Sequence, residues 1–345
     1  MASLGQWIQG ARPRTLPAAL APVLVGTSVA YYYLAPSIHV AQQLAALLGD
    51  RSEALIFGAA EKIDGGVAAL DAYRELGDLG ASTTWGQFWV RAVLALVVAL
   101  ALQVGVNYAN DYSDGIRGTD DVRVGPVRLV GQKLATPRAV KTAAFACFGV
   151  AAVCGLALVV ITQAWWLLAV GAAAILAAWF YTGGTRPYGY AGLGELFVFV
   201  FFGLVAVIGT TYVQILRVSW LAIVGGVAVG ALSVAILLCN NLRDIPTDEL
   251  SGKRTLAVRL GEHGTRAAYS VAIATPFIAL GGMAIGGVPK ALVGLVALPL
   301  AIRPTRLVRG GAEGRDLIPA LAGTGLLLLG YAVALSVGIA WSASA

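Results

Sequence analysis

The sequence predicts an all-α integral membrane protein: a bundle of nine transmembrane helices with a central cavity open to the cytoplasmic side. Three observations support this fold class. Hydrophobic residues make up 58% of the chain and charged residues 12%, whereas soluble domains carry about 25% charged residues. The apolar residues gather in runs close to the roughly 20 residues that span a bilayer as a helix. Two of these runs end in an acidic cluster, and we expect both clusters to face one cavity.

Nine apolar runs are candidates for the membrane spans, and those at 165–181 and 288–303 are the shortest. The full set lies at about 15–34, 88–109, 138–161, 165–181, 195–213, 219–239, 267–286, 288–303 and 317–341. Residues 1–14 precede them without a cleavage-site pattern, so we expect no removable signal peptide. We therefore expect a single membrane domain over residues 1–345.

Residues 35–86 interrupt the apolar pattern. They contain seven of the 18 acidic residues, and their apolar runs at 40–48 and 66–76 are too short to span a bilayer. We expect a long extracytoplasmic insertion with two or three short helices, of the kind that can lie on a membrane surface. The sequence assigns this insertion no role.

Lysine and arginine placement predicts the orientation, because cytoplasmic loops are enriched in these residues. With the N-terminus in the cytoplasm, 18 of the 24 lysines and arginines lie in cytoplasmic segments. We therefore expect the C-terminus outside and both acidic clusters on the cytoplasmic side. Because the three cysteines lie in apolar runs and the chain has only two histidines, we expect neither a disulfide framework nor a histidine-based metal site. We expect membrane lipid, and no nucleic acid, as a partner.

The first acidic cluster, NYANDYSDGIRGTDD, occupies residues 107–121 directly after an apolar run. If the helix continues, Asn107, Asp111 and Asp114 lie on one face, because they are four and three residues apart. Such acidic groups at the mouth of a membrane helix are costly unless they bind a cation. Carboxylate oxygens suit Mg²⁺, which usually binds few carboxylates together with substrate phosphates.

Two glycines punctuate the end of this cluster. We expect Gly115 and Gly118 to let the chain leave the helix and bring Asp120 and Asp121 towards the other carboxylates.

The second cluster, NNLRDIPTDE at residues 240–249, repeats the Asn-xxx-Asp spacing after another apolar run. Pro246 disfavours helical geometry at the residue before it, so we expect Asp248 to lie past the end of the helix. Two acidic clusters facing one cavity could bind a diphosphate through bridging Mg²⁺ ions.

Basic and aromatic residues follow both clusters. Arg128, Lys133 and Lys253 could bind diphosphate oxygens that the metal leaves free. The alternative, that they only anchor the protein in the membrane, stays open, and it is favoured for Arg303–Arg315. Residues 181–195, YTGGTRPYGYAGLGE, offer five glycines and three tyrosines. Their rings could stabilise a carbocation, or they could be an interfacial aromatic belt.

These strings resemble the UbiA superfamily of intramembrane prenyltransferases, and within it the 1,4-dihydroxy-2-naphthoate branch. The resemblance rests on residues 107–121, 125–130 (GPVRLV), 181–195 and 241–261, with ARPRTLP at 11–17, and it covers the chain except 35–86. It implies an enzyme of the bacterial inner (cytoplasmic) membrane that acts in menaquinone biosynthesis. The implied reaction transfers a polyprenyl group from polyprenyl diphosphate to 1,4-dihydroxy-2-naphthoate, giving carbon dioxide, demethylmenaquinone and diphosphate.

The resemblance also implies residue roles, with two Mg²⁺ ions as cofactor. The implied metal ligands are Asp111, Asp114, Asp120 or Asp121, Asp244 and Asp248. The implied substrate-binding residues are Asn107, Asn110, Arg128, Lys133, Arg186, Tyr188, Asn240, Asn241 and Lys253. Tyr181 would shield an allylic cation from water. Where the superfamily has a third aspartate this chain has Gly118, so the choice between Asp120 and Asp121 stays open.

Two other functions stay open. One is a UbiA-type transferase for another aromatic acceptor, such as 4-hydroxybenzoate or homogentisate. The other is a carrier of a lipid diphosphate or an ion, since transporters also place charges inside helical bundles. Acidic residues gathered at one mouth, with little charge in mid-span, favour the enzyme.

Overall fold

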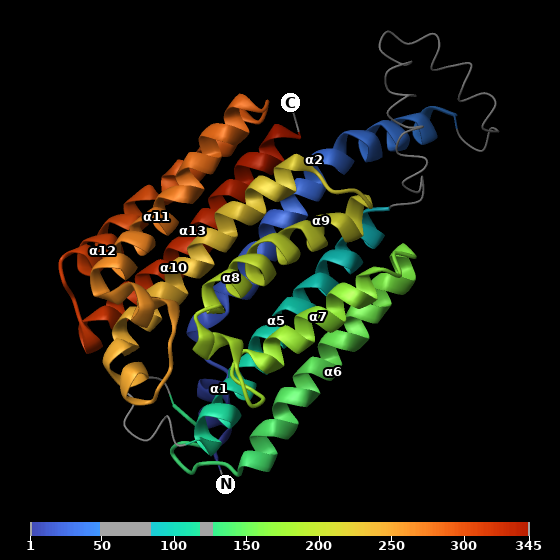
Figure 1. The fold of residues 1–345 in the computed structure, drawn as a ribbon. Helices are drawn as coiled ribbons and strands as arrows, with labels where there is room; N and C mark the ends of the chain where they lie inside the picture. Colours follow the sequence, from blue (N-terminus) through green and yellow to red (C-terminus); the bar gives the residue numbers. More distant parts are fainter. Residues whose placement is uncertain (1, 49–83, 118–126, 344–345) are drawn as a thin grey trace.

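The structure is a computed structural model that describes residues 2–48, 84–117 and 127–343. These residues form helices and connecting turns, with no strand among them, so the predicted all-α class is confirmed (Figure 1). The α-helices are α1 (Leu4–Gly10), α2 (Pro17–Leu48), α5 (Trp85–Ile116), α6 (Pro137–Thr162), α7 (Leu167–Phe180), α8 (Gly194–Val198), α9 (Ala206–Ile215), α10 (Trp220–Leu250), α11 (Leu256–Ile285), α12 (Leu298–Arg309) and α13 (Ile318–Ser342).

Shorter segments connect these helices. A π-helical segment, η3 (Phe199–Val205), joins α8 to α9 into one continuous element. The 3₁₀ segments are η1 (Pro13–Thr15), η2 (Tyr188–Ala191), η4 (Pro289–Ala297) and η5 (Gly314–Leu317).

In the described part of the chain, eight helical elements are long and apolar enough to cross a membrane. They are Pro17–Pro36, Trp85–Ile116, Pro137–Thr162, Gly194–Ile215, Trp220–Leu250, Leu256–Ile285, Pro289–Arg309 and Gly314–Ser342. Each corresponds to a predicted span. The ninth predicted span, at 165–181, is the apolar helix α7, which has only 14 residues. The predicted count of nine is therefore not confirmed.

The predicted insertion begins differently from our expectation. Helix α2 continues without interruption from the first span to Leu48, so residues 35–48 extend that helix. Most of the insertion, residues 49–83, lies outside the described residues, as do Gly118, Asp120 and Asp121 of the first acidic cluster.

Polar caps mark where several helices begin. Five of them start after a serine or threonine whose side-chain oxygen accepts a hydrogen bond from a backbone N–H in the first turn, which satisfies a donor that the helix leaves free. These residues are Ser3, Thr84, Thr136, Ser219 and Thr255.

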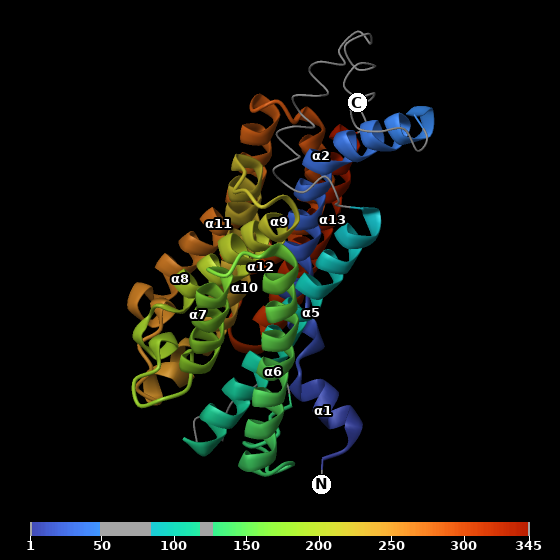
Figure 2. The ribbon, with the colours of Figure 1, turned by 90° about the vertical axis from the view of Figure 1, so that its right-hand side faces the viewer.

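The helices form two groups on either side of α2, α8 and α9 (Figure 1). Helices α10, α11, α12 and α13 lie on one side, and α5, α6 and α7 on the other; the rotated view in Figure 2 shows α6 and α7 beside α5. Helix α10 is the most enclosed span, with 67% of its apolar window buried. The C-terminal ends of α5 and α10, which carry the two acidic clusters, lie at the end of the bundle where the chain begins.

Close backbone contact between η3 and α10 depends on glycines. A Cβ on Gly203 would lie 2.5 Å from the Cα of Gly230 and 2.6 Å from the carbonyl oxygen of Gly226. Small residues allow membrane helices to approach in this way. Because both obstacles are backbone atoms, no side-chain rotation can relieve the clash.

Gly203→Ala is therefore expected to destabilise the protein by about 1–3 kcal/mol, the usual cost of overpacking. Gly209→Ala, in the same membrane-spanning element, is the matched control, because a Cβ there meets nothing within 4 Å. Thermal unfolding of the detergent-purified variants should show a lower midpoint for Gly203→Ala alone. Equal midpoints would contradict the close contact.

Candidate functional site

Helix α5 carries the first acidic cluster as the spacing predicts. It continues through the cluster to Ile116, and the side chains of Asn107, Asp111 and Asp114 are all buried on one face. The predicted helical continuation is thus confirmed.

Asp111 binds the loop that follows the cluster. Its side-chain oxygens accept hydrogen bonds from the backbone N–H groups of Leu129 (2.7 Å) and Val130 (3.1 Å), and the residue is 1% exposed. Asp111 therefore holds Leu129 and Val130, at the end of the GPVRLV loop, against α5.

Gly115 lies in the last turn of α5, which ends one residue later at Ile116. A Cβ on Gly115 would come within 2.5 Å of Cγ1 of Val130. The absence of a side chain lets the Asp111-bound loop pack against the helix.

Asp114 brings four separate parts of the chain together. One of its oxygens, Oδ1, accepts a hydrogen bond from the hydroxyl of Tyr190 and lies 3.5 Å from Nζ of Lys253. The other, Oδ2, lies 4.0 Å from a guanidinium nitrogen of Arg128. These residues, which we call the Asp114 cluster, come from α5, the GPVRLV loop, η2 and the loop after α10. Asp114, Arg128 and Lys253 are all buried.

Tyr190 is a member of this cluster that sequence reasoning missed. Its ring lies 4.5 Å from Nζ of Lys253 and 5.6 Å from the guanidinium carbon of Arg117, both within cation–π range. Burial, and then the nearby Asp114 carboxylate, raise the pKa of Tyr190 above its ordinary value. The hydroxyl therefore keeps its proton at neutral pH and donates a hydrogen bond to Asp114. No spacing rule distinguishes Tyr190 from the other two tyrosines of residues 181–195.

The loops around Tyr190 are fixed by backbone contacts. The backbone N–H of Arg254 donates to the carbonyl oxygen of Tyr190 at 2.9 Å. The guanidinium of Arg259 donates to the carbonyl oxygen of Ala191 at 2.8 Å, and that of Arg117 donates to the carbonyls of Thr182 and Gly184. The segment 181–195 is thus tied to the end of α5, to the loop after α10 and to the start of α11.

Our expectation for Asp248 was wrong. Helix α10 continues through Pro246 to Leu250, so Asp248 lies within its last turns and is buried. The hydroxyl of Thr247 donates to the carbonyl oxygen of Asp244 at 2.9 Å, and that of Ser251 to the carbonyl of Thr247 at 2.7 Å. Such side-chain bonds help a membrane helix to accommodate a proline.

Arg243 pairs with Asp244 of the second acidic cluster, and sequence reasoning missed this contact. Its guanidinium donates to both carboxylate oxygens of Asp244, at 2.7 and 2.8 Å, and to the side-chain oxygen of Asn240 at 2.8 Å. The available signal was the position of Arg243 directly before Asp244 in the sequence. The neighbouring Asn241 donates to the buried Glu195 at 2.9 Å.

Two predicted asparagines hold other segments in place. The side-chain amide of Asn107 donates to the carbonyl of Ala11 (2.9 Å) and to the hydroxyl of Thr15 (3.0 Å). Asn110 accepts a hydrogen bond from the hydroxyl of Thr182 at 2.8 Å. The predicted site face of α5 therefore also positions the N-terminal segment and the segment after α7.

Other predicted site residues lie at a distance from the cluster or pack elsewhere. Lys133 and Arg186 are exposed. Tyr188 donates its hydroxyl to the carbonyl of Ala177 at 2.7 Å and stacks on Phe197 with ring centroids 4.0 Å apart. The ring of Tyr181 meets that of Tyr188 edge-on at 5.5 Å. These two tyrosines form an aromatic wall beside the start of α8.

The predicted Mg²⁺ site can be compared with the donors that the structure describes. Within residues 2–48, 84–117 and 127–343, no three histidine, cysteine or acidic side chains lie close enough to hold a metal ion together. The donor chemistry nevertheless fits Mg²⁺, because buried carboxylates and amides lie at the ends of α5 and α10. Arg128, Arg243 and Lys253, which now face these carboxylates, are also groups that bind phosphate oxygens.

The fold and this buried polar end define an integral membrane protein with a candidate site at one end of a helical bundle. The chain belongs to the UbiA prenyltransferase family, which matches residues 76–344.

Similar proteins agree with this assignment. The 1,4-dihydroxy-2-naphthoate octaprenyltransferase of Mycobacterium tuberculosis is 48% identical over 99% of both chains. The protein of the same description from Escherichia coli is 34% identical, over 75% of this chain and 70% of its own. A solved structure of digeranylgeranylglyceryl phosphate synthase in membranes has a TM-score of 0.55 at 12% identity, covering 98% of this chain and 99% of that one. This last likeness supports the fold alone.

Proposed function

We propose that this membrane protein transfers a polyprenyl group from polyprenyl diphosphate to 1,4-dihydroxy-2-naphthoate in menaquinone biosynthesis. The main observation behind the proposal is the Asp114 cluster, in which a buried carboxylate from the first acidic cluster lies beside cations from two other loops. The full-length similarity to proteins described as 1,4-dihydroxy-2-naphthoate octaprenyltransferases supports this choice of reaction and acceptor.

The cations of the site would bind the diphosphate. Arg128 and Lys253 are buried beside Asp114, and a guanidinium and an ammonium both pair well with phosphate oxygens. Asp111, Asp114, Asp244 and Asp248 would hold two Mg²⁺ ions, which supply charge neutralisation to the leaving diphosphate. Tyr190, which stays protonated, would orient Asp114 and Lys253 during this step.

The remaining steps require electron-rich aromatic rings that keep water away from the reacting carbon atoms. When the allylic C–O bond breaks, its electron pair leaves with diphosphate, and the rings of Tyr181 and Tyr188 would shield the allylic cation from water. The naphthoate ring then forms the new C–C bond. Its carboxyl group leaves as carbon dioxide and returns its bonding pair to the ring. The product is the reduced form of demethylmenaquinone.

The placement of lysine and arginine residues supports a membrane orientation that puts the reaction on the cytoplasmic side. We propose a bacterial inner (cytoplasmic) membrane, with the N-terminus in the cytoplasm and the C-terminus outside. In this orientation the Asp114 cluster lies on the cytoplasmic side, where a soluble aromatic acid can reach it. The prenyl tail would enter a cavity between the helices from the lipid.

A product assay with the detergent-purified protein tests the proposal. We would supply a polyprenyl diphosphate and Mg²⁺ with either 1,4-dihydroxy-2-naphthoate or 4-hydroxybenzoate, and identify products by mass spectrometry. We expect a prenylated, decarboxylated product from the naphthoate alone, and its loss when EDTA removes Mg²⁺. Full turnover in EDTA would contradict the metal assignment.

The same assay separates the alternatives. Product from 4-hydroxybenzoate alone would leave the chemistry in place and overturn the acceptor. Tight binding of polyprenyl diphosphate with no product from either acceptor would contradict the enzyme. Transport of the unchanged diphosphate into sealed vesicles would then identify a carrier.

A further inference from the structure

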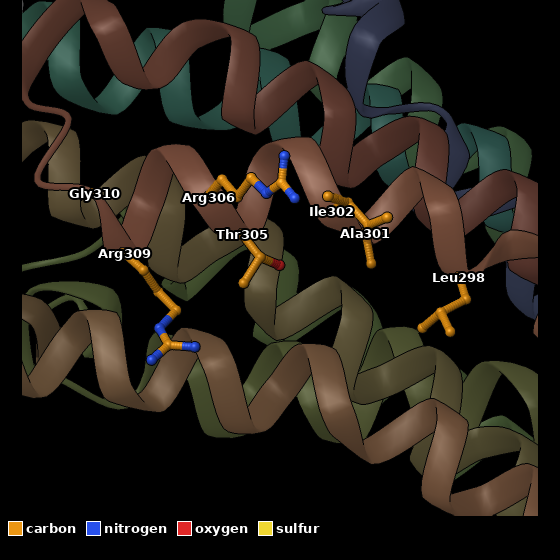
Figure 3. Close-up of a pocket in the computed structure, with 7 residues that line it drawn as sticks. All are labelled: Leu298, Ala301, Ile302, Thr305, Arg306, Arg309 and Gly310. Carbon is orange, nitrogen blue, oxygen red and sulfur yellow. The ribbon is translucent and has the colours of Figure 1, made fainter.

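An open groove of about 590 Å³ follows one face of α12, a helix that contributes no residue to the Asp114 cluster (Figure 3). The residues that line it recur at helical spacing of three and four, so they form a single stripe. They are Leu298, Ala301, Ile302, Thr305, Arg306, Arg309 and Gly310.

The stripe changes from apolar to cationic along the helix. Leu298 and Ile302 are exposed at the end near η4, 47% and 48% respectively. Arg306 and Arg309 lie at the other end, where α12 finishes on the same side of the bundle as the acidic clusters. At about 1.5 Å per residue, Leu298 and Arg309 are roughly 16 Å apart along the helix axis. This length suits the upper part of a lipid acyl chain and its headgroup.

The two arginines of the groove are not neutralised within the described part of the chain. Neither guanidinium makes a hydrogen bond or an ion pair with a described residue. The nearby carboxylate of Glu262 already pairs with Arg266 at 3.1 Å. Figure 3 shows the two side chains pointing to opposite sides of α12, so the groove presents one cation on each side to an anion from outside the protein.

Thr305 adds a second, independent observation. Its hydroxyl oxygen is buried and makes no hydrogen bond with any residue that the structure describes. A buried polar atom without a partner is unfavourable, which makes an external partner valuable. Figure 3 shows Thr305 between the two arginines and the apolar half of the groove.

We propose that this groove binds an anionic phospholipid. Arg306 and Arg309 bind the anionic headgroup from the two sides of the groove, and the hydroxyl of Thr305, once its side chain turns towards the groove, donates a hydrogen bond to the phosphate. One acyl chain lies over Ile302, Ala301 and Leu298. General anchoring by positive residues requires no apolar groove beside them, whereas a bound lipid requires both halves of the stripe.

Native mass spectrometry of the full chain with phosphatidylglycerol or phosphatidylcholine tests this proposal. We expect the wild type to retain phosphatidylglycerol with about thirtyfold preference, since two basic residues at a lipid surface contribute about 1 kcal/mol each and 1.36 kcal/mol corresponds to tenfold. The double variant Arg306→Gln/Arg309→Gln should lose this preference. The control Arg303→Gln/Arg315→Gln removes the same charge outside the groove lining and should keep it.

Several outcomes would overturn the proposal. Equal loss of phosphatidylglycerol in both double variants would mean that only net charge matters. If the wild type retained phosphatidylcholine as well as phosphatidylglycerol, the two arginines would confer no preference for an anionic lipid. Displacement of the lipid by glycerol 3-phosphate at an equal concentration would indicate a site for phosphate alone. Salt-sensitive preference in the wild type supports the proposal without relying on any variant.

Discussion

Asp114→Asn is expected to lower kcat for prenyl transfer by about a thousandfold. The variant keeps the size of the side chain and an oxygen that can accept from Tyr190, but it removes the charge that faces Lys253 and Arg128. Several kcal/mol of transition-state stabilisation depend on correctly placed charges around a leaving diphosphate, and each 1.36 kcal/mol corresponds to tenfold in rate. Steady-state turnover with saturating polyprenyl diphosphate and 1,4-dihydroxy-2-naphthoate measures this loss.

Glu262→Gln provides the matched control for Asp114→Asn. It makes the same change from carboxylate to amide at an exposed position, where Glu262 only pairs with Arg266. We expect activity within twofold of wild type, because exposed ion pairs contribute little. Thermal unfolding of both variants would show whether the fold is retained. Near wild-type turnover in a folded Asp114→Asn protein would remove Asp114 from the proposed machinery.

Local rules predict the parts of this protein that depend on nearby residues. Hydropathy and length locate the spans, because a membrane helix must satisfy its backbone internally and bury its apolar surface in lipid. Spacing alone places Asn107, Asp111 and Asp114 on one face of α5, as the structure confirms.

The same local rules fail where a contact with a distant residue, or a competing contact nearby, determines the end of a helix or the partner of a side chain. Pro246 ends a helix by local steric preference, yet α10 continues to Leu250 within the packed bundle. Asp244 has the spacing of a ligand, but its immediate neighbour Arg243 binds both of its oxygens. Tyr190 becomes part of the site because η2 directs it to Asp114, 76 residues away in the chain. No sequence motif predicts this contact.

Lys133 and Lys253 are a further pair whose roles local sequence rules could not distinguish. Both follow an acidic cluster, and the sequence assigns both to the diphosphate. In the structure Lys253 is buried, 3.5 Å from Asp114, whereas Lys133 is exposed in a turn where its φ is +56°. The order of residues could not distinguish them, because burial depends on how the two loops fold over the helix ends.

Lys253→Ala is expected to lower kcat/KM for polyprenyl diphosphate by roughly 10- to 100-fold, through a higher KM and a lower kcat. A hydrogen bond to a charged group contributes about 1.5–3 kcal/mol, and the phosphate would lose one such partner. Lys133→Ala, the matched control, should stay within threefold of wild type. The measurement is initial rate against polyprenyl diphosphate concentration at fixed acceptor.

The comparison of the two lysines also distinguishes a binding role from a structural one. Because Lys253 contacts Asp114 and the ring of Tyr190, its loss could disturb the cluster without any effect on phosphate binding. Lys253→Arg keeps the charge at this position and should recover most of the lost kcat/KM if the cation binds diphosphate. A KM for the naphthoate that rises as much as that for polyprenyl diphosphate would argue against a diphosphate ligand. A larger loss in Lys133→Ala than in Lys253→Ala would place the diphosphate on the exposed loop, outside the Asp114 cluster.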